Sequence, residues 1–286
     1  VTALQEGTAI AGENIPFSNI DQLVGAGVTV DSVDSYGIGF LMFNCQKEPF
    51  NDKRVRQAFH YAIDYDKLIK NQLGGNAETL TSYLPKDNPA YHEASTVYKY
   101  DPEKAKALLK EAGQENLEVK LLVIDNWIKD LSAQIQQDLQ AVGMNVTLDV
   151  QAAPYPTMAA SKTDEILPFD VFLAPGDVSC FGTNADVHLA WFYGENTDWC
   201  QGRSCWAKAG DGKCQEFNEY LDQARKATDA NTRQEAYNKC FDIISEEVPL
   251  YPLFHKKVVT GYWAGLIEGF EPSPTTGLYF QNAKLK

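Results

Sequence analysis

The stretch LEVKLLVIDNWIKDLSAQIQQDLQAVGMNVTLDV, residues 117–150, decides the fold class. Apolar residues alternate over 117–123 and again over 146–150, which is the period of a β-strand. Between these strands, apolar residues recur at helical spacing, at Ile128, Leu131, Ile135, Leu139 and Val142. Gly143 then ends the helix. The stretch therefore predicts a β-α-β unit with a right-handed crossover and two parallel strands.

Two further apolar runs belong to the same pattern. FDVFL at residues 169–173 is predicted to form another strand of this sheet, and GFLMF at residues 39–43 a buried strand. Residues 1–36 are punctuated by glycine and proline, which predicts loops and short strands, one of them at 28–30. These signals place the chain in the α/β class.

A helix is predicted directly after the strand at 39–43. Asp52 is a good N-cap residue, and Val55 and Phe59 lie on the apolar face that follows it. Arg54 and Arg56 fall on the opposite, water-facing side. Similar start and stop signals predict further helices at 64–74, 101–113, 215–228 and 231–247.

Residues 174–212 carry no clear period and are predicted as a long loop rich in aromatic residues and cysteine. A loop of that length in a compact domain is either a wrong assignment or functional. Four of the six cysteines lie in it or directly after it, at Cys180, Cys200, Cys205 and Cys214. They are candidates for disulfides; free buried thiols and a metal site are the alternatives, although the spacing lacks the paired knuckles of most zinc sites.

Composition limits the classes of function. The chain has 286 residues and a net charge of −14, which disfavours binding to nucleic acid. No apolar run is long enough for a membrane-spanning helix. The first residues lack the pattern of a signal peptide, so the protein is either cytosolic or a processed piece of an exported one.

No catalytic motif is found in the sequence, which favours binding over catalysis; no cofactor or metal is expected. Aromatic residues near predicted strand ends, among them Trp127, Tyr155 and Trp191, could contact a ligand, because α/β sheets present their binding crevices there. Asp177 and Asp186 lie nearby and could bind an amine. A hydrolase that uses a pair of carboxylates stays open as an alternative of another class.

Several segments resemble the extracellular solute-binding proteins of peptide/nickel-type ABC transporters. They follow the family order, from residue 36 to the end: FN at 43–44, PF at 49–50, DKRVRQA at 52–58, YAID at 61–64, YDPEKA at 100–105, GMNV at 143–146, EEVP at 246–249, GY at 261–262 and GF at 269–270. The resemblance implies a periplasmic-binding-protein-like α/β lobe, with a mixed sheet flanked by helices.

The resemblance also implies an organisation into lobes. The chain corresponds to the C-terminal half of such proteins and lacks the N-terminal lobe. Residues 1–36 would enter from that missing lobe, residues 37–256 would form the ligand-binding lobe, and residues 257–286 would return toward the missing lobe. The implied protein is a monomer, periplasmic or lipid-anchored on the outer face of the membrane, that delivers its solute to a membrane permease.

The resemblance suggests a role for one aspartate. Peptide-binding relatives have an aspartate after a strand that pairs with the α-amine of the ligand, and Asp177 in APGD at 174–177 stands at the corresponding place. Relatives that bind oligosaccharides share the fold and use aromatic stacking, so a sugar ligand is the alternative within the family.

Overall fold

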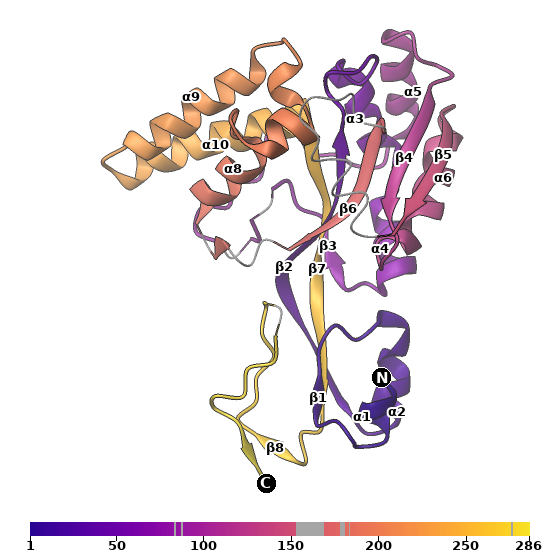
Figure 1. Cartoon of the computed structure of the whole chain (residues 1–286), viewed down its shortest axis with the longest axis vertical. Helices are drawn as coiled ribbons and strands as arrows, with labels where there is room; N and C mark the ends of the chain where they lie inside the picture. The colour runs from indigo at the N-terminus through magenta and orange to yellow at the C-terminus, as the bar shows by residue number, and fades with distance from the viewer. Residues whose placement is uncertain (83, 87, 153–168, 178–180, 183, 276) are drawn as a thin grey trace.

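Figure 1 shows the computed structural model of the chain, which describes residues 1–82, 84–86, 88–152, 169–177, 181–182, 184–275 and 277–286. Seven of the described strands form one mixed sheet in the order β1-β7-β2-β6-β4-β5, in which β3 (Ala77–Glu78) also pairs with β7. The other two, β8 and β9, form a separate two-stranded sheet. None of the helices in these ranges is long and apolar enough to cross a lipid bilayer.

The predicted β-α-β unit is confirmed. Strand β4 (Glu118–Ile124) and strand β5 (Asn145–Gln151) are parallel, and α6 (Lys129–Ala141) connects them. Strand β6 (Val171–Asp177) lies on the other side of β4, also parallel to it, as expected for a further strand of the sheet.

Two long antiparallel strands form the centre of the sheet. β2 (Thr29–Phe43) is continuous where the sequence predicts two short strands, and β7 (Leu250–Tyr262) pairs with it along most of its length. β6 is antiparallel to β2, so the sheet is mixed, as expected. The apolar periods break near residues 31–36 because the strand leaves the main core there, and the sequence therefore shows two strands instead of one.

Both strands continue below the main body in Figure 1 into a smaller part of the molecule. There they meet β1 (Ala11–Gly12), α1 (Thr2–Gln5), α2 (Ile20–Gly25) and the hairpin of β8 (Ile267–Glu268) and β9 (Lys284–Leu285). This part has its own small hydrophobic cluster, made of Leu4, Ile15, Leu23, Val28 and Val259. The main cluster lies above it and contains most of the buried apolar residues.

Helices cover both faces of the sheet (Figure 1). The first group is α3 (Lys53–Ala62), α4 (Tyr65–Leu73), α5 (Pro102–Glu111) and α6; the second is α8 (Ala185–Tyr193), α9 (Lys213–Lys226) and α10 (Ala230–Glu247). The predicted caps are confirmed: Asp52, Asp64 and Asp101 each accept a hydrogen bond from a backbone N–H in the first turn of their helix. Gly74 ends α4 in the left-handed conformation.

The expected long loop at 174–212 is wrong in its centre. Residues 185–193 form α8, which begins at Asn184; the Asn184 side chain accepts hydrogen bonds from two backbone N–H groups. A short π-helical turn follows at Trp199–Arg203. Helix α8 is apolar almost all round because Tyr193 contacts Leu250 of β7 on one side and Phe181 covers Trp191 on another, so no amphipathic period is visible in its sequence.

The prediction that Arg56 faces water is also wrong. Its side chain is fully buried, and Nη2 lies 3.2 Å from Oε2 of Glu247 at the end of α10. The guanidinium also donates to the backbone carbonyls of Glu247, Phe50 and Asn51 at 2.7 to 3.1 Å. Since all these acceptors converge on one planar group, Arg56 joins α3, the preceding turn and α10.

The expected disulfides are not found among the described cysteines. Cys45, Cys200, Cys205, Cys214 and Cys240 are free and buried; Cys180 lies outside the described residues. Cys240 is a core residue. The Sγ atoms of Cys200 and Cys214 are 3.3 Å apart, a thiol contact. The hydrogen bond between them and burial raise the pKa of Cys200, so this thiol is protonated at neutral pH.

We expect Arg56→Met to destabilise the fold by about 3–5 kcal/mol, because the substitution leaves Oε2 of the buried Glu247 carboxylate and several buried carbonyls without their donor. Urea unfolding measures the loss. Arg54→Met is the matched control: it removes an arginine of the same helix whose side chain is 43% exposed and pairs with Asp52 at the surface, and it should change the midpoint much less. Equal small effects of both variants would contradict the structural role of Arg56.

We expect mild oxidation to join Cys200 and Cys214. With diamide, the two thiols give up two electrons and two protons to the oxidant and form one S–S bond. The bond closes a short loop and should stabilise the fold by up to about 3 kcal/mol. A non-reduced proteolytic digest should contain a peptide that links residues 200 and 214, and Cys200→Ser should abolish it. A reproducible absence of this linkage in folded, diamide-treated protein would contradict the expectation.

Candidate ligand-binding site

Three adjacent strands bring distant residues into one row. Gly37 on β2 pairs with Lys256 on β7 and, on its other side, with Asp177 at the end of β6. Residues directly opposite each other in antiparallel strands lie on the same face of a sheet. The backbone register therefore places positions 256, 37 and 177 side by side across the sheet.

The central position of this row has no side chain. A Cβ at Gly37 would lie 3.2 Å from Oγ of Ser35. The Ser35 hydroxyl accepts a hydrogen bond from the Gly37 N–H and donates to the carbonyl of Lys256, so it folds back against the backbone where the register between β2 and β7 shifts. Two residues along, a Cβ at Gly39 would collide with Phe254 and Ile128 at 2.8 to 2.9 Å. Gly37 therefore leaves the surface of the sheet uncovered at this position, and Gly39 allows Phe254 and Ile128 to pack closely against the backbone.

A cavity of about 230 Å³ lies next to the sheet at Gly37. Both the main body and the smaller lower part contribute to it, through Asn14, Ser35, Gly37, Trp127, Pro175, Gly176, Lys256, Val258 and Pro274. Lys256 is the one ionisable side chain among these lining residues. The cavity lies beside the carboxyl ends of β4 and β6, which is where open α/β sheets bind ligands.

Trp127 forms one wall of the cavity. It lies in the turn between β4 and α6, where the Asn126 side chain accepts a hydrogen bond from the Ile128 N–H and fixes the start of the helix. The indole packs against Phe254, with ring centroids 6.4 Å apart. The Nζ atom of Lys256 lies 4.8 Å from the centroid of the Trp127 ring, a cation–π contact.

The predicted ligand residues are not all near this cavity. Trp127 lines it, and Asp177 follows directly after the lining residues Pro175 and Gly176. Asp186 lies in the first turn of α8 and forms an ion pair with Arg225, with Nε and Oδ1 2.6 Å apart. Trp191 on the same helix is half exposed and packs against Phe181. Tyr155 lies outside the described residues.

Sequence reasoning missed Lys256, Ser35 and Gly37. Lys256 lies within an otherwise apolar strand, and its neighbour Lys257 looks equivalent to it in the sequence. In the structure the two have different surroundings: Lys256 lines the cavity with its Nζ over the Trp127 ring, and the Nζ of Lys257 lies 3.2 Å from Oδ1 of Asp34. The one available signal was the Gly-x-Gly spacing at 37–39 inside a strand, which indicates close approach of another group.

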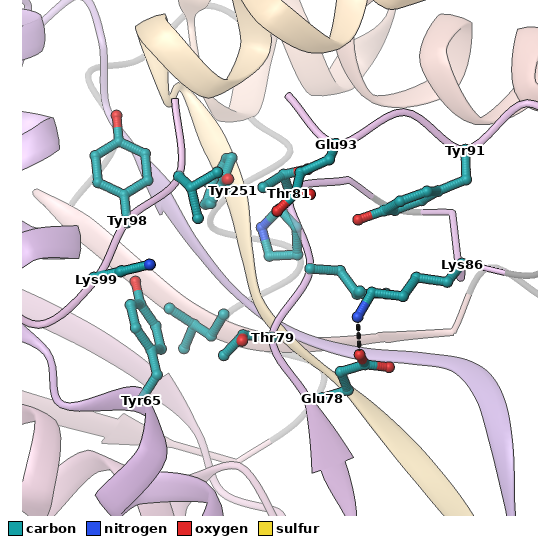
Figure 2. A pocket seen from close by; sticks show the side chains of 14 residues that line it. Tyr65, Glu78, Thr79, Thr81, Lys86, Tyr91, Glu93, Tyr98, Lys99 and Tyr251 are labelled. Atoms are coloured by element: carbon teal, nitrogen blue, oxygen red, sulfur yellow. Dashed lines mark hydrogen bonds and ion pairs between the residues drawn. The ribbon is translucent and has the colours of Figure 1, made fainter. Parts of the chain in front are cut away.

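A second cavity, of about 280 Å³, lies between residues 78–99 and β7. Figure 2 shows Tyr65 and Tyr98 at one end of it and the ion pair of Lys86 with Glu78 at the other. The Tyr98 hydroxyl donates to the Ser245 carbonyl at 2.7 Å, which ties this wall to α10. Neither cavity contains a metal cluster: no three His, Cys, Asp or Glu residues gather in the part of the chain that the structure describes.

Comparison with known proteins identifies the fold and the family. The family model of the bacterial extracellular solute-binding proteins, family 5 (middle part), matches residues 1–193. The dipeptide-binding protein of Escherichia coli K12 is 26% identical over 262 residues, which cover 87% of this chain and 46% of that protein.

Solved structures share the fold. The periplasmic binding protein DppA of Helicobacter pylori, in complex with the peptide STSA, superposes with a TM-score of 0.81 at 22% identity, over 99% of this chain and 54% of that one. NikA of Staphylococcus aureus, in complex with Ni(L-His)2, gives a TM-score of 0.77 at 16% identity, over 96% and 56% of the two chains. The chain thus spans about half the length of these relatives.

The family model covers more than half of the chain, and the mixed sheet with helices on both faces agrees with it. The chain therefore belongs to the bacterial extracellular solute-binding proteins of family 5.

Proposed function

We propose that the protein captures peptides outside the membrane and delivers them to the permease of an ABC importer. The observation that supports this most is the cavity at the ends of β4 and β6, with the Asp177 position at its edge, in a chain of a solute-binding family. The dipeptide-binding protein and the peptide complex among the relatives support the same class of ligand. The protein acts by binding and release, without covalent chemistry.

In this proposal the chain supplies one lobe of a two-lobed clamp. Residues 37–256 form the ligand-binding lobe, and residues 1–36 and 257–286 belong with a second lobe. Their separate hydrophobic cluster and the passage of β2 and β7 between the two parts support this division. Closure of two lobes about such a connection would bury the ligand between them. Export, anchoring at the membrane surface and monomeric state belong to the same proposal.

The proposed role of Asp177 is to bind the α-ammonium of the peptide. The position lies at the end of β6, opposite Gly37, where an extended ligand that crosses the sheet at Gly37 could reach it. A hydrogen bond between a carboxylate and an ammonium in a closed cleft contributes more binding free energy than one between two neutral groups. Removal of the charge on either partner should therefore weaken binding.

The first experiment compares free and N-acetylated peptides by calorimetry on the full-length gene product. Acetylation should weaken binding about fivefold or more, which corresponds to about 1 kcal/mol. Asp177→Asn should reduce the difference between the two peptides. Asp186→Asn is the matched control, since this carboxylate is paired with Arg225 and should leave the difference unchanged. Equal affinity of wild type for both peptides would remove Asp177 from this role.

Oligosaccharide capture is the alternative, and Trp127 is the residue that would carry it. Trp127 lines the cavity and could offer a face to a sugar ring. The Lys256 ammonium lies over that ring, however, and a sugar would have to displace it. If the protein bound a glycan on a glycan array and bound no peptide, oligosaccharide capture would be supported and peptide capture would be contradicted.

We expect the 286-residue chain by itself to bind peptide at least roughly tenfold more weakly than the full-length gene product, because an open half-site surrounds less of the ligand. Calorimetry with one peptide and both proteins tests this. Equal affinity of the two proteins would show that the chain already contains the whole binding site and would contradict the two-lobed proposal.

A further inference from the structure

We propose that the cavity between residues 78–99 and β7 is a second binding site, which takes a small zwitterion with a methylated ammonium group, of the betaine class. The site is distinct from the candidate peptide site, because the two cavities have no lining residue in common in the part of the chain that the structure describes. The inference therefore goes beyond the proposed function and does not depend on it.

The cavity forms where the pairing of two strands ends. β3 pairs with β7 over two residues, Ala77 and Glu78. Residues 79–81 then diverge from β7, in which Pro252 has no N–H with which to continue the ladder. A space of about 280 Å³ lies between the two segments. Small-molecule sites range from about 300 to 1,000 Å³, so the occupant of this one is small.

Tyrosine rings form much of the cavity wall, from Tyr65, Tyr91, Tyr98 and Tyr251. The Tyr98 hydroxyl donates to the Ser245 carbonyl at 2.7 Å, and the Tyr65 hydroxyl lies 2.7 Å from Nδ1 of His60. Since these hydroxyls are bonded to the protein, the two side chains present ring carbon to the cavity. The rings of Tyr98 and Tyr251 stand at 78° to each other, with centroids 5.5 Å apart. Aromatic rings around a small space are a recognition element for quaternary ammonium groups.

The charged side chains of the wall lie at two ends of the cavity. Figure 2 shows the ion pair of Lys86 with Glu78 at one end and Lys99 beside Tyr65 at the other. Glu78, and more weakly Glu93, raise the pKa of Lys86, so both carboxylates lie near the same ammonium. One end thus has two carboxylates around one ammonium, and the other end has the Lys99 ammonium. A ligand with a positive and a negative group at its two ends matches this arrangement.

Tyr251 offers a hydrogen-bond donor to the occupant. It is 3% exposed, and its hydroxyl has no hydrogen-bond partner among the residues that the structure describes. Burial raises the pKa of Tyr251, so the hydroxyl keeps its proton at neutral pH. A buried hydroxyl without a partner is unfavourable. A carboxylate oxygen of the ligand would accept this hydrogen bond.

The wall favours a methylated ammonium over a primary one. A primary ammonium has three N–H donors, each of which needs an acceptor. Glu78 already accepts from Lys86, and much of the remaining wall consists of rings and of the apolar side chains of Leu80, Val97 and Leu253. A trimethylammonium group has no N–H donor and is attracted by the ring faces. The cavity thus fits this group better than the amine of an ordinary amino acid.

The experiment measures the binding of three small probes to the full-length gene product by calorimetry. Glycine betaine is the expected ligand, tert-butylacetate has the same shape without the positive charge, and glycine has the same charges without the methyl groups. Each of the last two should bind roughly tenfold more weakly than glycine betaine, because each lacks part of the cation–π contact. Equal affinity for glycine betaine and tert-butylacetate, or no binding of glycine betaine, would overturn the inference.

Variants of Tyr91 test the aromatic wall. Tyr91→Leu removes a half-buried ring and should weaken glycine betaine binding about fivefold, whereas Tyr91→Phe keeps the ring and should bind as wild type does. Tyr100→Leu is the matched control, because Tyr100 belongs to the same segment, is 48% exposed and does not line the cavity. Thermal unfolding shows that the variants fold. Unchanged affinity in a folded Tyr91→Leu protein would contradict the aromatic recognition.

Lys99→Met tests the other end of the cavity. It should weaken the binding of glycine betaine about fivefold and leave that of tetramethylammonium unchanged, because tetramethylammonium has no carboxylate for Lys99 to bind. An equal loss for both probes would contradict the proposed orientation of a zwitterion.

Competition separates this site from the peptide site. Saturation of the protein with a peptide should leave the affinity for glycine betaine unchanged, since the two cavities have separate walls. Displacement of glycine betaine by the peptide would place both ligands at one site and overturn the inference. If no peptide bound while glycine betaine bound as described, the proposed function would be contradicted and this inference would stand.

Discussion

The antiparallel pairing of β2 with β7 is the constraint on which the rest of the structure depends. The two strands come from opposite ends of the chain, and their register runs from Thr29 opposite Tyr262 to Met42 opposite Leu250. In the upper part they are the middle of the main core, and in the lower part they carry the small cluster around Val28 and Val259. One pair of strands thus determines how the two hydrophobic clusters are placed relative to each other.

The same pairing creates the candidate site. At the register shift between Val33 and Gly37, the Ser35 side chain turns back against the backbone. Regular pairing resumes at Gly37, which therefore lies between β7 and β6. A one-residue slip of β7 would move Lys256 to the opposite face and bring His255 to the cavity. The site is therefore held by the sheet itself, which gives its residues more precise positions than a flexible loop would.

The helices around the sheet are locked by polar contacts as well as by apolar packing. The Arg56 guanidinium is buried among backbone carbonyls and the Glu247 carboxylate. Asp170, directly before β6, forms an ion pair with Lys47 and accepts a hydrogen bond from the backbone N–H of Lys120. Buried charges of this kind are costly unless every partner is present. They consequently favour one arrangement of α3, α10 and the strand ends.

The sequence by itself determined the local elements whose signals are contained in neighbouring residues. The period of 117–150 gave the β-α-β unit, and Asp52, Asp64 and Asp101 marked the helix starts, because caps and apolar spacing act within a few residues. Trp127 was found in the same way, from its place after a predicted strand. The tertiary structure alone decided the burial of Arg56, the helix α8 and the difference between Lys256 and Lys257. The burial of Arg56 depends on Glu247, helix α8 depends on its contact with the sheet, and the place of Lys256 depends on its pairing with Gly37. Each of these partners is far away in the chain, so no local periodicity of the sequence indicates it.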